Sequence, residues 1–259
     1  MKKLFKQRIK ISILWIPYLF IFLPIFGKKL WFFIFMMLTI HESAHILVAI
    51  LLGYKLQCVR VYPFGLAAQI QYMGFGDTRK ECLIVLAGPL MHVSLLPLLL
   101  LLFMRMSWIS ESFYVYLCTM NKAFFLFNIL PIYPLDGGRI LQCILHSIFS
   151  YKLAQKLMLI MSGVFLTWCL YVRIFQGLSS YILVCFIYLQ IWLGFHNLVY
   201  DAYAFYQYRF QHALPYPIFM HKKDDLYRMR HNVIISRYGL LYERAWISYK
   251  LLKRGVGDR

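Results

Sequence analysis

The chain has 259 residues, of which 61% are hydrophobic and only 15% are charged. Soluble globular proteins carry about 25% charged residues, so this composition excludes an ordinary soluble fold. The formal net charge is +18, but the Lys and Arg residues lie mostly between the apolar runs and in the C-terminal part. That placement is typical of the cytoplasmic segments of a membrane protein, so we expect the partner to be the lipid bilayer and no nucleic acid.

The apolar residues form runs long enough to cross a bilayer, which takes roughly 20 residues of helix. We therefore predict an all-α polytopic membrane protein with about six transmembrane helices. The predicted spans cover residues 11–26, 30–53, 82–104, 113–134, 153–173 and 180–200. The excess of Lys and Arg in alternate connecting segments predicts that the N-terminus and the C-terminus both lie in the cytoplasm.

The segment between the second and third predicted spans is not a simple loop. It contains the sequence CVRVYPFGLAAQIQYMGF, whose alternating β-branched and aromatic residues indicate a small β-hairpin or re-entrant element. Open strand edges cannot face lipid, so this element must pack on protein or line a cavity. We predict a six-span domain over residues 1–200 and a basic cytoplasmic tail over residues 201–259.

The second predicted span contains the sequence HESAH at residues 41–45. On a helix, His41 and His45 point to one face about one turn apart, so both imidazoles can reach one zinc ion at roughly 2.0–2.1 Å. Glu42 is then placed to act as the base on metal-bound water. Ionisable groups within a span cost at least about 2.5 kcal/mol each, which favours a functional cavity. A polar contact between helices is the alternative interpretation.

A catalytic zinc ion usually has three protein ligands and an open position, so the histidine pair needs a third ligand. Most of the ten acidic residues lie at span ends, in a polar loop or in the tail. Asp136 remains, in FNILPIYPLDGGRI at the cytoplasmic end of the fourth predicted span, where Gly137 and Gly138 permit a tight turn. We predict one Zn²⁺ per chain with Asp136 as third ligand; a helix N-cap or turn role is the alternative.

HESAH together with N-x-x-P-x-x-P-L-D-G-G at residues 128–138 resembles the site-2 protease family (peptidase family M50) of intramembrane zinc metalloproteases. The resemblance covers residues 1 to about 200 and, with the YPFGLAAQIQY segment, is greatest to the sporulation branch. It implies that His41, His45 and Asp136 bind zinc and that Glu42 is catalytic. It also implies two groups of substrate-binding residues. The first group shapes the substrate site and comprises Asn128, Pro131 and Pro134. The second group pairs with an extended substrate and comprises Tyr62, Pro63, Phe64 and Gly65.

The resemblance implies a metalloendopeptidase that cleaves a membrane-associated precursor. In the sporulation branch this precursor is the pro-form of the late mother-cell sigma factor, whereas other members cut anti-sigma factors or signal-peptide remnants. The implied partners include membrane-protein inhibitors or regulators, and the implied location is the cell membrane, at the outer forespore membrane facing the mother cell. A non-catalytic membrane metal transporter that uses the same ligands is the alternative from a different class.

Two features depart from the family pattern. The family often has asparagine at the end of A-G-P-x-x-N in the third span, whereas AGPLMH here ends in His92, which we interpret as a packing residue. The sporulation branch typically carries a C-terminal nucleotide-binding regulatory domain of the cystathionine-synthase type. Residues 201–259 are too few for the whole of it, so we expect that this domain is missing or reduced, and nucleotide control does not carry over from the resemblance.

Overall fold

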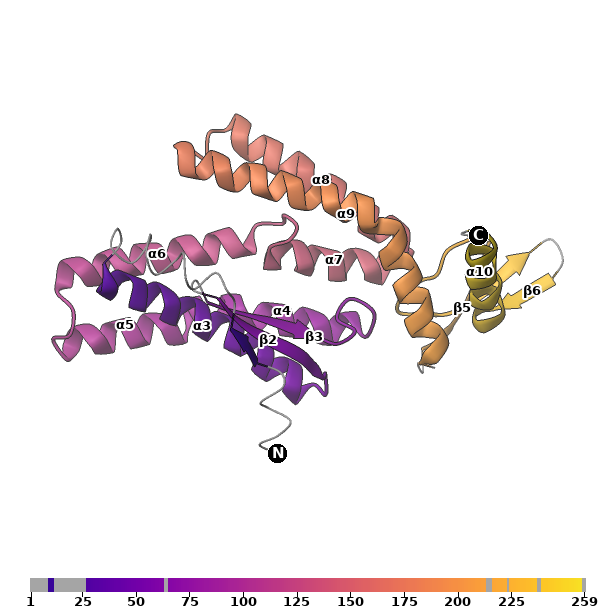
Figure 1. Ribbon diagram of the computed structural model, residues 1–259, viewed down its shortest axis with the longest axis horizontal. Helices are drawn as coiled ribbons and strands as arrows, with labels where there is room; N and C mark the ends of the chain where they lie inside the picture. The colour runs from indigo at the N-terminus through magenta and orange to yellow at the C-terminus, as the bar shows by residue number, and fades with distance from the viewer. Residues whose placement is uncertain are drawn as a thin grey trace. The chain divides into compact units, whose positions relative to one another are not determined.

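The computed structural model describes residues 9–11, 27–62, 65–212, 216–222, 224–236 and 239–257. These residues are mostly helical with two small sheets, which confirms the predicted fold class (Figure 1). The helices are α3 (Lys28–Leu51), α4 (Thr78–Val93), α5 (Leu95–Arg105), α6 (Glu111–Ile129), α7 (Asp136–Ile148), α8 (Tyr151–Tyr171), α9 (Leu178–Gln211) and α10 (Glu243–Gly257). The strands are β1 (Ile9–Ile11), β2 (Leu56–Tyr62), β3 (Gly65–Ile70), β4 (Ile218–His221), β5 (His231–Ser236) and β6 (Gly239–Tyr242).

Within the described residues, four helical segments are long and apolar enough to cross a membrane: Lys28–Leu51, Thr78–Arg105, Tyr151–Tyr171 and Ser180–Gln211. They correspond to the second, third, fifth and sixth predicted spans. The first predicted span lies outside the described residues except for Ile11, which ends β1. The fourth predicted span, residues 113–134, corresponds to the shorter helix α6, which ends at Ile129 because the prolines that follow cannot continue a helix. The number of spans therefore stays a prediction.

The chain divides into two compact units, each with its own hydrophobic core. The first unit comprises Met1–Met73 and Lys80–Leu130, and the second comprises Gly74–Arg79 and Pro131–Arg259. In the second unit α9 continues without a break past residue 200. The division into a membrane domain and a tail at that residue stays a prediction.

The first unit is built around α3. Phe33 and Met37 on this helix pack with residues of α5 and α6, which form a helical hairpin (Figure 1). The buried positions of α3 recur every three or four residues and include both histidines: Phe33, Met37, His41, Ala44, His45 and Ala49. The same helix exposes apolar side chains such as Leu47 and Leu51, which suit contact with lipid. The helix therefore turns its two histidines away from its lipid-suited surface.

The segment after α3 forms the predicted hairpin. Gly53, with a φ of +85°, ends the helix in a Schellman motif in which the N–H of Tyr54 donates to the carbonyl of Ala49 at 2.9 Å. β2 and β3 then pair antiparallel, which confirms the hairpin. β3 contacts α3, so the sheet packs on protein as the bilayer requires. The parallel strand β1, which extends the sheet beyond β2, was not predicted.

The second unit contains α7, the helical hairpin of α8 and α9, and a small α/β element formed by β4–β6 and α10 (Figure 1). In this element β4 pairs parallel with β5, and β5 pairs antiparallel with β6. Phe205 and Tyr206 of α9 share a buried core with Ile234 of β5 and Trp246 and Ile247 of α10. The element is therefore packed directly onto the C-terminal end of α9.

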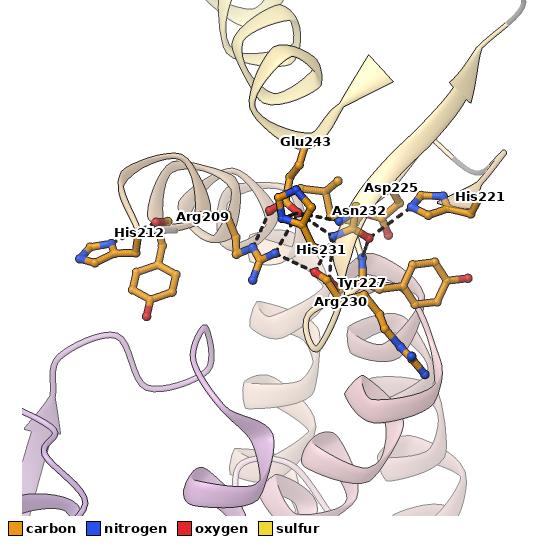
Figure 2. Close-up of polar contacts among 11 residues, drawn as sticks. Arg209, His212, His221, Asp225, Tyr227, Arg230, His231, Asn232 and Glu243 are labelled. Atoms are coloured by element: carbon orange, nitrogen blue, oxygen red, sulfur yellow. Dashed lines mark hydrogen bonds and ion pairs between the residues drawn. The ribbon is translucent and has the colours of Figure 1, made fainter. Parts of the chain in front are cut away.

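A buried ion pair reinforces this packing. Arg209 of α9 donates two hydrogen bonds, at 2.6 and 2.8 Å, to the carboxylate of Glu243, the first residue of α10 (Figure 2). The backbone and side-chain amides of Asn232 donate to the same carboxylate at 2.8 and 3.1 Å. Burial opposes ionisation of Glu243, but the Arg209 guanidinium and the Asn232 amides hold the pKa of this carboxyl below its ordinary value. The charge network thus fixes α10 and β5 to α9.

Candidate metal centre

The two histidines of HESAH lie close together on the buried face of α3. Their Nε2 atoms are 3.1 Å apart, and His41 and His45 are only 4% and 9% exposed. Each residue of the group His41, Glu42 and His45 offers one ligand atom, and these three atoms lie within 4.8 Å of one another. The structure therefore brings together the first three residues predicted for the metal centre.

The hydrogen bond of His45 fixes which of its nitrogens is available to a metal. Its Nδ1 lies 2.7 Å from the backbone carbonyl oxygen of Ile84 in α4. A carbonyl oxygen only accepts hydrogen bonds, so Nδ1 carries the proton of the neutral ring and Nε2 keeps its lone pair. His45 therefore presents an unprotonated nitrogen toward Nε2 of His41. Metal-binding histidines in general have this arrangement, with the outer nitrogen donating to a fixed acceptor.

The donor set and its spacing fit a zinc ion. Zinc binds imidazole nitrogen at about 2.0–2.1 Å in tetrahedral sites, which sets two such nitrogens about 3.3–3.4 Å apart. The observed Nε2–Nε2 distance of 3.1 Å is close to that separation. Imidazole nitrogens and a carboxylate are also the donors that zinc takes in its catalytic sites. His41 and His45 thus fit two ligands of one zinc ion.

Gly88 explains how α4 approaches the histidine pair so closely. A Cβ atom at this position would lie 2.2 Å from Nε2 of His45 and 2.7 Å from Cε1 of His41, well inside van der Waals contact. Only glycine leaves room for both rings against the backbone of α4. The glycine of the AGP sequence is therefore a packing requirement of the metal centre.

Asp136 is the first residue of α7, directly after the N-cap residue Leu135. The two glycines that follow lie within the helix, and Gly138 permits a close approach of the preceding connection, because a Cβ atom there would lie 2.5 Å from the carbonyl oxygen of Ile132. Asp136 belongs to the second unit, whereas the histidine pair belongs to the first. Its role as third zinc ligand stays a prediction.

The predicted substrate-binding residues lie in several places. Asn128 is in the last turn of α6, and Pro131 and Pro134 are in the connection to α7. Tyr62 and Gly65 end β2 and begin β3, and the two residues between them, Pro63 and Phe64, lie outside the described residues. β3 forms an edge of its sheet among the described strands. The substrate roles of all these residues stay predictions.

His92 and Asn121 belong to the centre but were not predicted for it. Nε2 of His92 lies 3.1 Å from Nδ1 of His41, and its Nδ1 lies 2.7 Å from Oδ1 of Asn121. Both side chains are buried, at 2% and 4% exposure. The interpretation of His92 as a packing residue missed this polar role. One signal was available, because an asparagine within the apolar α6 is costly in a membrane unless it bonds to another buried polar group.

Comparison with known proteins supports a metalloprotease class for this fold and site. The model of peptidase family M50 matches residues 103–172, a stretch that includes Asp136 and the prolines before it. Among solved structures, the site-2 protease from Methanocaldococcus jannaschii resembles the chain in fold, with a TM-score of 0.53 and 22% identity over 72% of this chain and 89% of that chain. Together with the relatives described next, the family match makes part of the chain similar to peptidase family M50.

Two curated relatives make the comparison more specific. Stage IV sporulation protein FB of Bacillus subtilis is 27% identical over 156 residues, which make up 59% of this chain and 54% of that protein. A zinc metalloprotease of Methanocaldococcus jannaschii is 28% identical over 173 residues, 66% of this chain and 49% of that protein. The chain thus spans about half the length of the curated relatives it matches. The first relative belongs to the sporulation branch that the sequence resembles.

Proposed function

We propose that the protein is a zinc-dependent intramembrane metalloendopeptidase of the site-2 protease type. The observation that carries the proposal is the pair His41 and His45 on the buried face of an apolar helix, with their Nε2 atoms 3.1 Å apart and the half-buried Glu42 beside them. Polar groups of this kind are retained within membrane helices mainly where they do chemistry or line a polar cavity. A hydrolase that acts at membrane depth accounts for both their identity and their position.

The chemistry follows from the ligand set and the neighbouring glutamate. His41, His45 and, in the proposal, Asp136 would hold a zinc ion, which would supply a lowered pKa of water, toward about 7, and polarisation of a peptide carbonyl. Glu42 lies next to the first ligand, and its carboxylate is within reach of the same position as both imidazoles. It accepts the proton of the attacking water and later delivers it to the leaving amine.

The sheet of the first unit offers a place for the substrate backbone. A peptide bond within a transmembrane helix is protected by the helix's own hydrogen bonds, so the substrate must unwind before cleavage. The groups that are freed need new partners, because lipid supplies none. Addition of the unwound strand to the edge of β3 supplies them, and this edge packs near α3, which carries the histidine pair. In this proposal Asn128, Pro131 and Pro134 shape the remainder of the substrate site.

The proposed substrate is a membrane-associated precursor, namely the pro-form of the late mother-cell sigma factor. The similarity to stage IV sporulation protein FB supports this choice over anti-sigma factors or signal-peptide remnants. The proposed setting is the outer forespore membrane, with both termini in the mother-cell cytoplasm and with membrane-protein regulators as further partners. The basic residues of the segments between the helices support this orientation.

The test is co-expression of the protein with the candidate precursor in a non-sporulating host, followed by immunoblotting for the shortened product. We expect cleavage by the natural protein and by Glu111→Gln, a control at the exposed start of α6. Glu42→Gln should abolish cleavage while the purified protein still retains zinc. A variant Glu42→Gln that cleaves as fast as the natural protein would refute the protease mechanism. Zinc flux that survives Glu42→Gln, without cleavage by any form, would instead indicate the transporter.

A further inference from the structure

The metal centre is connected to a chain of buried polar groups that crosses three helices. It runs from Asn121 on α6 to His92 on α4 and then to His41 on α3. All three side chains are less than 5% exposed. Histidine nitrogens can donate or accept and an amide can be turned either way, so the direction of these bonds is settled by a partner that has a single role. The described residues include such a partner.

That partner is the backbone carbonyl of His92. Nδ2 of Asn121 donates to it at 2.7 Å, and a carbonyl oxygen can only accept. The amide of Asn121 is therefore oriented with its oxygen toward the ring of His92, where Oδ1 lies 2.7 Å from Nδ1. Since Oδ1 also only accepts, Nδ1 of His92 carries the proton and Nε2 of the neutral ring is an acceptor.

The same logic fixes the proton of the zinc ligand. Nε2 of His92 accepts from Nδ1 of His41 across 3.1 Å, so His41 carries its proton on Nδ1 and keeps the lone pair on Nε2. This nitrogen faces Nε2 of His45, whose own proton is held on Nδ1 by the carbonyl of Ile84. Both histidines therefore direct lone pairs toward the same place.

We infer that His92 and Asn121 are positioning residues that hold His41 in the tautomer and ring orientation required for metal binding. The inference rests on the proposed function, because it concerns the same metal centre. It also explains the departure from the A-G-P-x-x-N pattern: the position needs a buried acceptor for His41, and the longer imidazole provides one when Asn121 orients it. Groups that bond the outer nitrogen of a ligating histidine typically change metal affinity about 10–100-fold when they are removed.

The experiment measures zinc affinity of the detergent-purified full chain by competition with a chelator of known affinity. His92→Leu removes the acceptor, and Asn121→Leu removes the group that orients it, so each should weaken zinc binding about 10–100-fold. His92→Gln places an amide oxygen at about the reach of Nε2 and should restore affinity to within about threefold of the natural protein. Thr119→Val is the matched control, since Thr119 lies on the same helix as Asn121, is exposed, and donates its hydroxyl to the backbone carbonyl of Val115 one turn earlier.

A second readout separates positioning from packing. Cobalt bound in place of zinc reports ligand geometry through its visible absorption, so the leucine variants should alter this spectrum and His92→Gln should preserve it. Zinc affinity unchanged in Asn121→Leu, or equally weak in His92→Leu and His92→Gln, would overturn the inference. If His92→Leu does not yield folded protein, Asn121→Leu and His92→Gln decide in the same way. A natural protein that binds no zinc would refute the proposed function itself, which is a different outcome.

Discussion

Substitution of Gly88 by alanine tests the geometry of the metal centre most directly. The added Cβ would lie 2.2 Å from Nε2 of His45, whereas ordinary contacts begin at 3.4 Å, so an overlap of about 1.2 Å must be relieved. The ring of His45 is held on its other side by the carbonyl of Ile84, and His41 is 2.7 Å from the same Cβ position. The rings or α4 must therefore shift by about 1 Å, a displacement that costs roughly 100-fold in rate at an active site.

The backbone itself should tolerate this substitution. Alanine is favoured over glycine in a helix interior by about 0.5–1 kcal/mol, so Gly88→Ala should not unfold α4 for lack of helix propensity. Gly163→Ala in α8 is the matched control, because a Cβ atom there meets no other atom within 4 Å. We expect Gly163→Ala to keep zinc content and cleavage, and Gly88→Ala to lose about 100-fold in cleavage with weakened zinc binding.

The assay combines metal analysis of the purified variants with the rate of precursor cleavage and a thermal unfolding measurement. Reduced zinc content and rate would place the effect at the histidine pair if the variant and the natural protein unfold at the same temperature when both are measured without zinc. Full zinc content and full cleavage in Gly88→Ala would refute the reasoning, because the rings cannot stay where they lie with a methyl group at that position. A loss of the same size in Gly163→Ala would show that the effect belongs to glycine replacement in general.

Three further outcomes are expected. A zinc chelator should abolish cleavage, and zinc returned at 100 times its dissociation constant should raise the free energy of unfolding by about 2.7 kcal/mol, seen as a higher unfolding temperature. Asp136→Asn should lower the zinc content of the purified protein. Asp77→Asn is the control and should not lower it, because asparagine keeps a side-chain acceptor for the N–H of Arg79. Equal zinc content in the two variants would exclude Asp136 as a ligand. The pKa of Glu243 in the folded protein is held below its ordinary 4.5. The ionised carboxylate therefore stabilises the C-terminal element fully above pH 4.5, and this stabilisation is lost as the pH falls through the lower pKa of the folded state. Glu243→Gln should remove this dependence and destabilise the element by about 3 kcal/mol, read as faster proteolysis after α9 near neutral pH; equal proteolysis of both forms would contradict it.

The residues of the centre that the sequence predicts are those whose relation is local. His41 and His45 share a face because four residues make about one turn of helix, and the apolar context of α3 predicts that helix. The hairpin of β2 and β3 is similarly local, since its strands are joined by only two residues, Pro63 and Phe64. In each case the pattern and the contact lie in the same short segment.

The remaining features depend on contacts that no local pattern encodes. Strand β1 has three residues and pairs Ile9 with Val59, fifty positions away, so it leaves no alternation long enough to detect. His92 and Asn121 are 29 residues apart, and each alone reads as a single polar residue in an apolar helix. The cost of burying such groups does show that partners exist, but the identity of the partner depends on how the helices pack.

The hydrogen bonds of the centre also show why its polar residues can be placed in an apolar helix. Reversal of the bonds between Asn121 and His41 would turn Oδ1 of Asn121 toward the carbonyl of His92, so that two acceptors would face each other. It would also move the proton of His41 onto Nε2, where it would block a metal. The arrangement that satisfies the buried polar groups is therefore also the one that leaves Nε2 of His41 available to a metal. The carbonyl of His92, which can only accept, sets the direction of the bonds for the whole chain. The carbonyl of Ile84 does the same for His45, so two backbone groups of α4 determine how α3 presents its ligands.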